Sequence, residues 1–282
     1  FLSICCLSNV SNDEHNYGKR PMNVANLSPL KTTNLVLGYQ KITVIPSLNL
    51  EIEKGQISVL VGGNGCGKST ILKSMARLLA PTSGLIHLYN KNLNRLSGKE
   101  VARSLAILPQ GPIAPEGLTV EHLVRQGRYP HQNWLQSWTK EDERIVTQAL
   151  TATHMLELAG RPIEALSGGQ RQRAWIAMAL AQDTDILLLD EPTTYLDLTH
   201  QIEILDLLFE LNQKQGTTIV MVLHDLNLAC RYAHQMIAVK EGAIFRQGPP
   251  EDILDVAMIE AVFGMQCHLI KDPLFGTPMC IP

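Results

Sequence analysis

The chain has few of the features that mark several large classes of protein. Its 282 residues include six cysteines, none in a Cys-x-x-Cys pair, so the usual zinc and thiol-redox motifs are excluded. Lysine and arginine number 24 against 27 aspartates and glutamates, and the net charge of −3 gives no electrostatic support for stable nucleic-acid binding. No apolar run approaches the roughly 18 residues that a membrane-spanning helix needs. The sequence therefore predicts a protein that is soluble or peripheral to a membrane.

The first 30 residues differ in character from the rest. They begin with Phe1, are rich in serine and asparagine, and lack a basic region before the apolar stretch 1–7, so they make a poor signal peptide. We interpret residues 1–30 as a disordered N-terminal extension, with Met22 as the expected start of translation. The folded domain is expected to occupy residues 31–282, which is long enough for one large domain.

From residue 31 onward, short β-branched runs alternate with helical patterns. Helices are expected over 71–79, 170–181, 199–214 and 251–263, followed by a proline-rich tail. Alternation of this kind predicts an α/β fold with a mostly parallel sheet wrapped by helices. The expected strands are 35–37, 42–45, 48–52, 57–61, 85–89, 105–108, 186–189, 217–223, 237–240 and 243–247.

Residues 114–166 interrupt this alternation with a helical insertion. Thr139 to Asp142 resembles a helix-capping signal, and residues 127–131 have the composition of a loop. Behind the cap, apolar residues recur at helical spacing and predict one buried face: Ile145, Ala149, Ala152, Leu156 and Ala159.

The most informative motif lies at residues 62–70. It fits the phosphate-binding pattern G-x-x-x-x-G-K-[ST] and stands between an apolar strand and a helix, the context that such a loop requires. Its glycines let backbone N–H groups surround a phosphate, and the helix N-terminus adds positive potential. A disulfide would be out of place there, which indicates a reducing cytoplasm. The residues expected to bind nucleotide are Gly62, Gly63, Asn64, Gly65, Cys66, Gly67, Lys68, Ser69 and Thr70.

Two further motifs follow in the second half of the chain. Ser167-Gly168-Gly169-Gln170 immediately precedes a helix, and Asp190-Glu191 ends an apolar strand. Together with the phosphate loop, they resemble the ATP-binding subunits of ABC transporters, and the resemblance extends from residue 31 to the C-terminus. It implies a P-loop NTPase (RecA-like) core with an antiparallel β subdomain and an inserted helical subdomain. It also implies ATP hydrolysis, with Mg²⁺ as cofactor.

The resemblance assigns nucleotide and metal contacts to individual positions. Tyr39 matches the aromatic residue that stacks on adenine, although a tyrosine that merely fills a turn is the alternative. Ser69 and Asp190 match the Mg²⁺ ligands. Gln110 matches a glutamine whose amide oxygen joins the Mg²⁺ shell or orients water.

Catalytic roles follow from the same resemblance. Glu191 would polarise the attacking water, and His224 would contact the γ-phosphate and hold Glu191. Because the transition state of phosphoryl transfer is loose, positioning the water matters more than full proton abstraction. Gln110 is expected to assist catalysis through its contact with Mg²⁺ or with water. His200 and His234 are expected to be surface residues.

The signature at 167–170 implies a second copy of the chain. Its serine hydroxyl and glycine N–H groups would form an anion site that faces the γ-phosphate held by the other subunit. Asp197 matches the loop that crosses between the two subunits in a head-to-tail dimer. The alternative is that Ser167 only caps its helix.

Finer features resemble one subfamily of ABC importers, which serves ferric siderophore, haem and cobalamin uptake, and most of all the ferric enterobactin type. The stretches that carry this resemblance are 123–131, 195–201, 224–227, 231–233 and 272–273. No chemical role follows for each of them from the sequence.

An importer subunit of this kind implies several partners. These are a second copy, integral-membrane permease subunits and, indirectly, a periplasmic or lipoprotein substrate-binding protein, with no nucleic acid. The expected location is peripheral, on the cytoplasmic face of the inner membrane. The alternatives are a soluble ABC ATPase that acts on ribosomes or DNA, and a P-loop kinase, which would lack the signature at 167–170.

Overall fold

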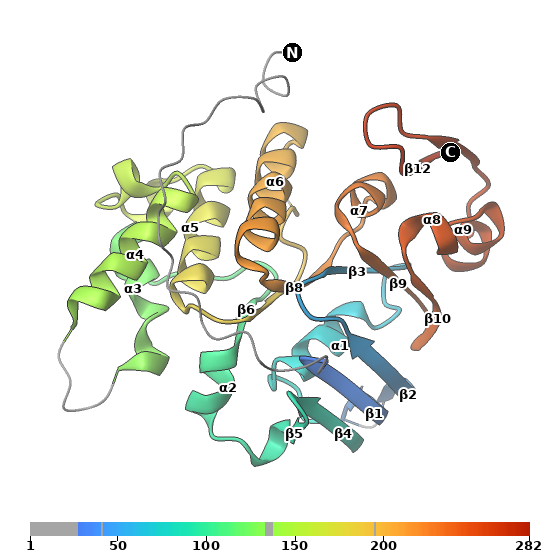
Figure 1. The fold of residues 1–282 in the computed structure, drawn as a ribbon, viewed down its shortest axis with the longest axis horizontal. Helices are drawn as coiled ribbons and strands as arrows, with labels where there is room; N and C mark the ends of the chain where they lie inside the picture. Colours follow the sequence, from blue (N-terminus) through green and yellow to red (C-terminus); the bar gives the residue numbers. More distant parts are fainter. Residues whose placement is uncertain (1–27, 41, 133–137, 195) are drawn as a thin grey trace.

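The structure is a computed structural model, which describes residues 28–40, 42–132, 138–194 and 196–282 (Figure 1). The expected N-terminal extension up to residue 27, its proposed start at Met22 and the expected contribution of Tyr195 lie outside the described residues. The first strand begins at Leu30, one residue before the expected start of the folded domain. Within the described part of the chain, no helix is both long and apolar enough to cross a bilayer.

A six-stranded sheet forms the centre of the molecule, in the order β10-β9-β3-β8-β7-β6. Five of its strands are parallel, and β10 pairs antiparallel with β9. The carboxyl ends of parallel strands meet at one edge, where ligands bind in folds of this class. The strands are β3 (Ile57–Val61), β6 (Leu105–Leu108), β7 (Ile186–Leu189), β8 (Thr218–Val222), β9 (Gln235–Lys240) and β10 (Ala243–Gly248).

A second, antiparallel sheet has the order β2-β1-β4-β5. The two strands expected over 42–45 and 48–52 are a single strand, because the pairing with β1 continues through a register shift beside Pro46. Proline has no N–H to donate, so an irregular ladder accommodates it. The strands are β1 (Leu30–Tyr39), β2 (Ile42–Ile52), β4 (Ser83–Leu88) and β5 (Lys91–Asn92).

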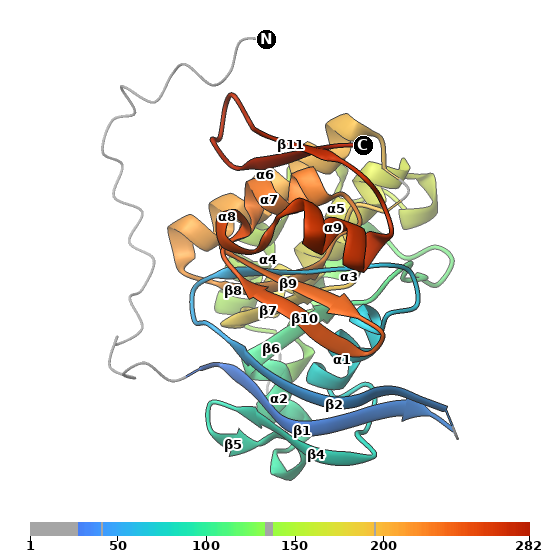
Figure 2. The same cartoon turned by 90° about the vertical axis from the view of Figure 1, so that its right-hand side faces the viewer.

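Two hydrophobic cores cover the two faces of the central sheet. Ile186 and Leu188 of β7 belong to the core between the two sheets, and Leu187 and Leu189 belong to the core on the opposite face. Side chains of a strand point alternately to its two faces, so a strand buried on both sides is apolar throughout. Figure 2 shows α1 (Lys68–Met75) lying between the antiparallel sheet and the central sheet.

The helical insertion packs as α3 (Val120–Gln126) and α4 (Lys140–Ala152) against α5 (Gly168–Ala181), on one side of the molecule (Figure 1). The capping signal is confirmed, since Thr139 and Asp142 form a capping box. The predicted apolar face is too long. α4 ends at Ala152, because the Thr153 hydroxyl bonds back to Ala149 O and His154 is left-handed at φ 55°, and Leu156 is exposed.

The remaining helices differ from expectation in places. α2 (Gly98–Ser104) and α7 (Leu226–Tyr232) were not expected, and each has only seven residues. The helix expected over 251–263 is two helices, α8 (Pro250–Ile253) and α9 (Val256–Phe263), because Asp255 caps a new start. α6 is as expected (Leu198–Gln215). The proline-rich tail is a hairpin of β11 (His268–Lys271) and β12 (Pro278–Ile281).

Candidate nucleotide-binding and catalytic site

The phosphate loop joins β3 to α1, and two of its glycines cannot be replaced without strain. Gly62 has φ 149° and Gly67 has φ 107°, backbone angles that glycine adopts without steric cost. A Cβ on Gly62 would lie 2.2 Å from Val239 O, and one on Gly67 would lie 2.5 Å from Ile45 Cδ1. The loop is therefore held tightly between β9 and β2.

Lys68 is buried at the start of α1 and is directed back into the loop. Its Nζ donates to Gly62 O and Gly63 O, both at 2.9 Å. Gly67 at the N-cap offers no side chain to the first-turn N–H groups of α1. A helix start without a side-chain cap, next to a buried ammonium, suits the phosphates of a nucleotide.

Two oxygen-bearing side chains lie together where a metal ion is expected. Ser69 Oγ donates to Asp190 Oδ1 at 2.7 Å, and Asp190 Oδ2 is buried without a hydrogen-bond partner. Burial raises the pKa of Asp190 above its ordinary value, against the lowering effect of the bond from Ser69. An orphaned carboxylate oxygen is costly unless a partner supplies compensation, and Mg²⁺ prefers such hard oxygen ligands. These two residues therefore fit the expected cofactor.

The same two residues form a small ligand set. Among the described residues, no group of three or more histidine, cysteine, aspartate and glutamate side chains could hold a metal. Mg²⁺ usually keeps several waters and is bound through one or two carboxylates plus phosphate oxygens, a requirement that Asp190 and Ser69 can meet.

Glu191 is the centre of a cluster that three adjacent strands bring together. Gln110 follows β6, Glu191 follows β7 and His224 follows β8. Gln110 Nε2 donates to Glu191 Oε2 at 2.7 Å, and His224 Nε2 donates to Oε1 at 2.7 Å. Thr194 Oγ1 also donates to Oε2, at 2.9 Å. The carboxylate thus accepts three hydrogen bonds at the carboxyl edge of the parallel sheet.

The charge state of Glu191 follows from these contacts. Burial by itself raises the pKa of its carboxyl, but the hydrogen bonds from His224 and Thr194 and the positive charge of Lys68 together lower it below the ordinary value. Glu191 is therefore ionised at neutral pH and able to accept hydrogen bonds.

The cluster confirms one expected contact and adds others. His224 holds Glu191 as expected, whereas its contact with a γ-phosphate stays a prediction. The contact of the Gln110 amide oxygen with Mg²⁺ or water stays a prediction, and the amide nitrogen of Gln110 donates to Glu191. Thr194 was not identified from the sequence. Its place three residues after Glu191, across Pro192, is the turn spacing that could have revealed it.

The signature residues lie at the first turn of α5. Ser167 Oγ accepts from Gln170 N at 3.3 Å, and Gln170 Oε1 accepts from Ser167 N at 3.1 Å, a complete capping box. Ser167 and Gly168 are exposed. The alternative reading of Ser167 as a helix cap is thus part of the structure, and its role toward a second nucleotide stays a prediction.

Asp197 connects the signature to the start of α6. Its Oδ1 accepts from His200 N at 2.9 Å and lies 2.7 Å from His200 Nδ1, and these hydrogen bonds lower the pKa of Asp197. The His200 ring lies so close to Gly169 that a Cβ there would be 2.6 Å from its Cδ2. His200, expected as a plain surface residue, therefore packs between the two motifs.

Tyr39 ends β1 and is half-exposed, on the hairpin whose Ile45 touches Gly67. Its stacking on adenine stays a prediction. His234, also expected at the surface, is half-buried. Its Nδ1 accepts from Ile57 N at 3.0 Å, its ring stacks on Phe209, and burial lowers its pKa.

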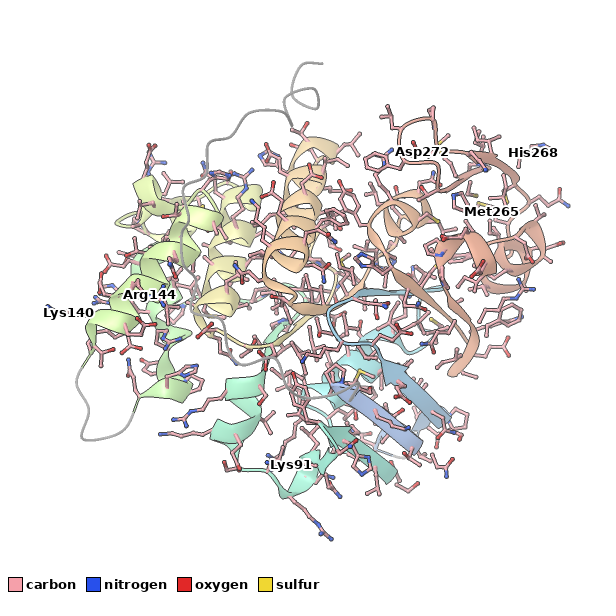
Figure 3. All side chains as sticks on the ribbon, in the orientation of Figure 1. Lys91, Lys140, Arg144, Met265, His268 and Asp272 are labelled. Carbon is pink, nitrogen blue, oxygen red and sulfur yellow. The ribbon has the colours of Figure 1, made fainter. Side chains whose placement is uncertain are left out.

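Three residues from the stretches without a chemical role in the sequence anchor the C-terminal hairpin, namely Asn227, Arg231 and Asp272. Asn227 bonds both the N–H and the C=O of Cys280. Arg231 bonds Asp272 at 2.7 Å and lies over the ring of Phe275. Figure 3 shows Asp272 on this hairpin, at the end of the molecule opposite Lys140 of α4. The hairpin is therefore fixed to α7, the helix that follows His224.

The comparisons with known proteins agree with this site. The family model described as ABC transporter matches residues 45–194. The petrobactin import ATP-binding protein of Bacillus anthracis is 61% identical over 90% of this chain and 93% of its own length. The ferric enterobactin transport ATP-binding protein of Escherichia coli is 49% identical, with the same coverage of both chains.

A solved structure shows that the likeness includes the three-dimensional fold. The dimeric structure of an ATP-binding cassette in a post-hydrolysis state, bound to ADP and Pi, superposes with a TM-score of 0.69 at 30% identity. The match covers 78% of this chain and 98% of that one. This chain belongs to the ABC transporter family, as one of its ATP-binding, ATP-hydrolysing subunits.

Proposed function

We propose that this chain powers the import of ferric siderophores, of a catecholate and enterobactin-like class, through a separate membrane permease. The observation that carries the proposal is the 61% identity, over 90% of the chain, to a petrobactin import ATP-binding protein. The enterobactin relative, at 49%, is less similar, so ferric siderophores as a class have stronger support than enterobactin itself.

The working unit is a dimer of two copies with two ATP molecules between them. Lys68 and the first turn of α1 bind the phosphates of one ATP. Ser167 and Gly168 are exposed at the start of α5 and would face the γ-phosphate held by the partner copy, with Asp197 at the junction. The dimeric cassette bound to ADP and Pi supports this arrangement.

Within this unit, each residue of the cluster has a distinct task. Ser69, Asp190 and Gln110 would hold Mg²⁺, which when bound neutralises charge on the phosphates. A carboxylate offers about four lone-pair positions, and three of them on Glu191 accept protein donors. A further lone-pair position on this carboxylate would accept a hydrogen from the attacking water and so orient it. Replacing Glu191 with Gln should leave ATP binding intact and stall hydrolysis.

The permease would contact the surface near the Gln110 loop and the helical insertion. Ile113 is 92% exposed and Tyr129 is 65% exposed, so a permease that covered them would bury apolar surface, which favours association. The chain would lie peripherally on the cytoplasmic face of the inner membrane, and a periplasmic or lipoprotein substrate-binding protein would deliver the siderophore to the permease.

Growth of the source cell tests the proposal. Lys68→Ala at the native locus should abolish growth with a ferric catecholate siderophore as sole iron source, while growth on ferrous iron or in cobalamin-dependent medium continues. Lys214→Ala, which removes an exposed lysine that pairs with Glu210 on α6, should grow normally in all three media. Normal growth of Lys68→Ala on the siderophore would move the assignment to haem, cobalamin or another chelate.

Membrane association tests the class of function separately. The protein should sediment with membranes that contain its permease and stay in solution without them. Sedimentation with ribosomes or retention on DNA, independent of membranes, would instead favour a soluble ABC ATPase.

A further inference from the structure

We propose that Thr194 is a positioning residue for Glu191, which fixes the carboxylate in the orientation that hydrolysis needs. Thr194 Oγ1 donates to Glu191 Oε2 at 2.9 Å, and both side chains are partly buried. The inference rests on ATP hydrolysis at this site and assigns a role to a residue outside the motifs identified in the sequence.

The backbone around Glu191 prepares this contact. Glu191 has φ 54°, in the left-handed region, which is strained for a residue other than glycine. Thr194 N donates to Glu191 O at 3.3 Å, so residues 191–194 close a turn with Pro192 as its second residue. The Thr194 hydroxyl therefore meets the Glu191 carboxylate within a single turn of fixed shape.

Thr194 differs from the other two donors in where it comes from. Gln110 and His224 belong to loops after other strands, and both are exposed. Each of them is also expected to contact the nucleotide or its metal, and a donor that turns to such a ligand leaves Glu191. Thr194 shares a turn with Glu191 and can keep its bond through that change.

A hydrogen bond that persists during the reaction restricts the rotation of the carboxylate. A hydrogen bond to a charged group contributes about 1.5–3 kcal/mol, which corresponds to roughly a 10- to 150-fold change in rate if all of it acts on the transition state. Nucleotide binding depends on Lys68 and the phosphate loop, so the loss of Thr194 should leave it unchanged.

Two substitutions separate positioning from folding. Thr194→Val keeps the shape of the side chain and removes the hydroxyl, and it should lower kcat for ATP about tenfold or more, with KM unchanged within about twofold. Thr194→Ser keeps a hydroxyl and should retain kcat within about threefold. Fluorescent ATP-analogue binding and the melting temperature, measured on the full chain, provide readouts that do not depend on turnover.

The matched control is Thr184→Val, two residues before β7, on the other side of that strand from the turn at 191–194. Thr184 Oγ1 donates to Ile186 O at 2.9 Å, so this substitution also removes one hydroxyl hydrogen bond but should leave kcat unchanged. Full activity of Thr194→Val would overturn the proposal. A loss in Thr194→Ser equal to that in Thr194→Val, or a parallel rise in KM, would do the same.

A double-mutant cycle with Glu191→Gln decides whether Thr194 acts through Glu191. Single-turnover hydrolysis of labelled ATP should show that Thr194→Val causes no further loss in the Glu191→Gln background. An equal further loss there would mean an independent role and reject the proposal. Normal turnover of Glu191→Gln by itself would instead contradict the role of Glu191, which keeps the two failures distinguishable.

Discussion

The helices α1 and α5 both begin at motifs expected to face phosphate, but their first turns are built differently. α1 begins after Gly67, which has a left-handed backbone and no side chain to cap the N–H groups that follow. α5 begins after Ser167, whose hydroxyl and backbone N–H are both paired with Gln170. The first-turn N–H groups of α1 are left for a ligand, whereas the capping box of α5 already pairs the N–H of Gln170.

This difference indicates an order of events. The first N–H groups of a helix have no partner within the helix, so an uncapped start favours an anion. The phosphate loop would therefore gain bonds as soon as ATP arrives. The signature at α5 gains less, because a phosphate must share or replace the bonds of a complete capping box. ATP should bind first at α1 and meet α5 of the partner copy only afterwards.

The largest effect on ATP hydrolysis should come from removing the ammonium group of Lys68, the first residue of α1. Lys68→Ala should lower ATP hydrolysis about 10²–10³-fold and weaken nucleotide binding, because the buried ammonium is lost from the phosphate site. Steady-state hydrolysis and equilibrium binding of a fluorescent ATP analogue measure the two losses. Tight binding by Lys68→Ala would show that the uncapped helix start suffices.

An intermediate effect should follow from adding a side chain at Gly67, the uncapped start of α1. Gly67→Ala places a Cβ 2.5 Å from Ile45 Cδ1 at φ 107°, and should lower the free energy of unfolding by about 1–3 kcal/mol and reduce ATP affinity. Gly216→Ala is the matched control, because it is also left-handed, at φ 66°, but has nothing within 4 Å. It should lose about 1 kcal/mol by urea denaturation and bind ATP normally.

The smallest effect on stability should come from the capped start of α5. Ser167→Ala should cost about 1 kcal/mol of unfolding free energy, as loss of an N-cap does, and should leave ATP binding to the monomer unchanged. Ser97→Ala removes the matching capping box of α2 and should cost the same. Turnover should fall about tenfold in Ser167→Ala alone, one hydrogen bond to a charged group being lost. Equal turnover in Ser167→Ala and Ser97→Ala would mean that Ser167 acts only as a structural cap.

Sequence reasoning succeeded where the signal was local. The phosphate loop, the strands of the parallel sheet and the Thr139 cap are determined by residues within a few positions of each other, and all three are present as expected. The order of the motifs also placed Gln110, Glu191 and His224 after neighbouring strands, and these three meet in the structure.

Sequence reasoning failed where a contact depends on a hydrogen-bond partner that lies far along the chain. The C-terminal hairpin depends on Asn227, which bonds the backbone of Cys280 53 residues later, and no local pattern reveals that pairing. The orientation of Gln110 is likewise set by Glu191 across 81 residues. α7 was missed because seven residues give too little periodicity, although Asp225 caps it by accepting from Asn227 N and Leu228 N.

The buried pair of Arg128 and Asp142 gives the helical insertion a mechanical property. Arg128 Nε donates to Asp142 Oδ1 at 2.9 Å, and its Nη1 donates at 3.0 Å to Ala181 O, in the last turn of α5. Ser167 lies at the other end of that helix. Arg128 therefore joins the insertion to the C-terminal end of α5, a helix of 14 residues and about 21 Å whose first turn carries the signature. A partner that displaced the insertion at Tyr129, beside Arg128, would pull on the same helix that carries Ser167.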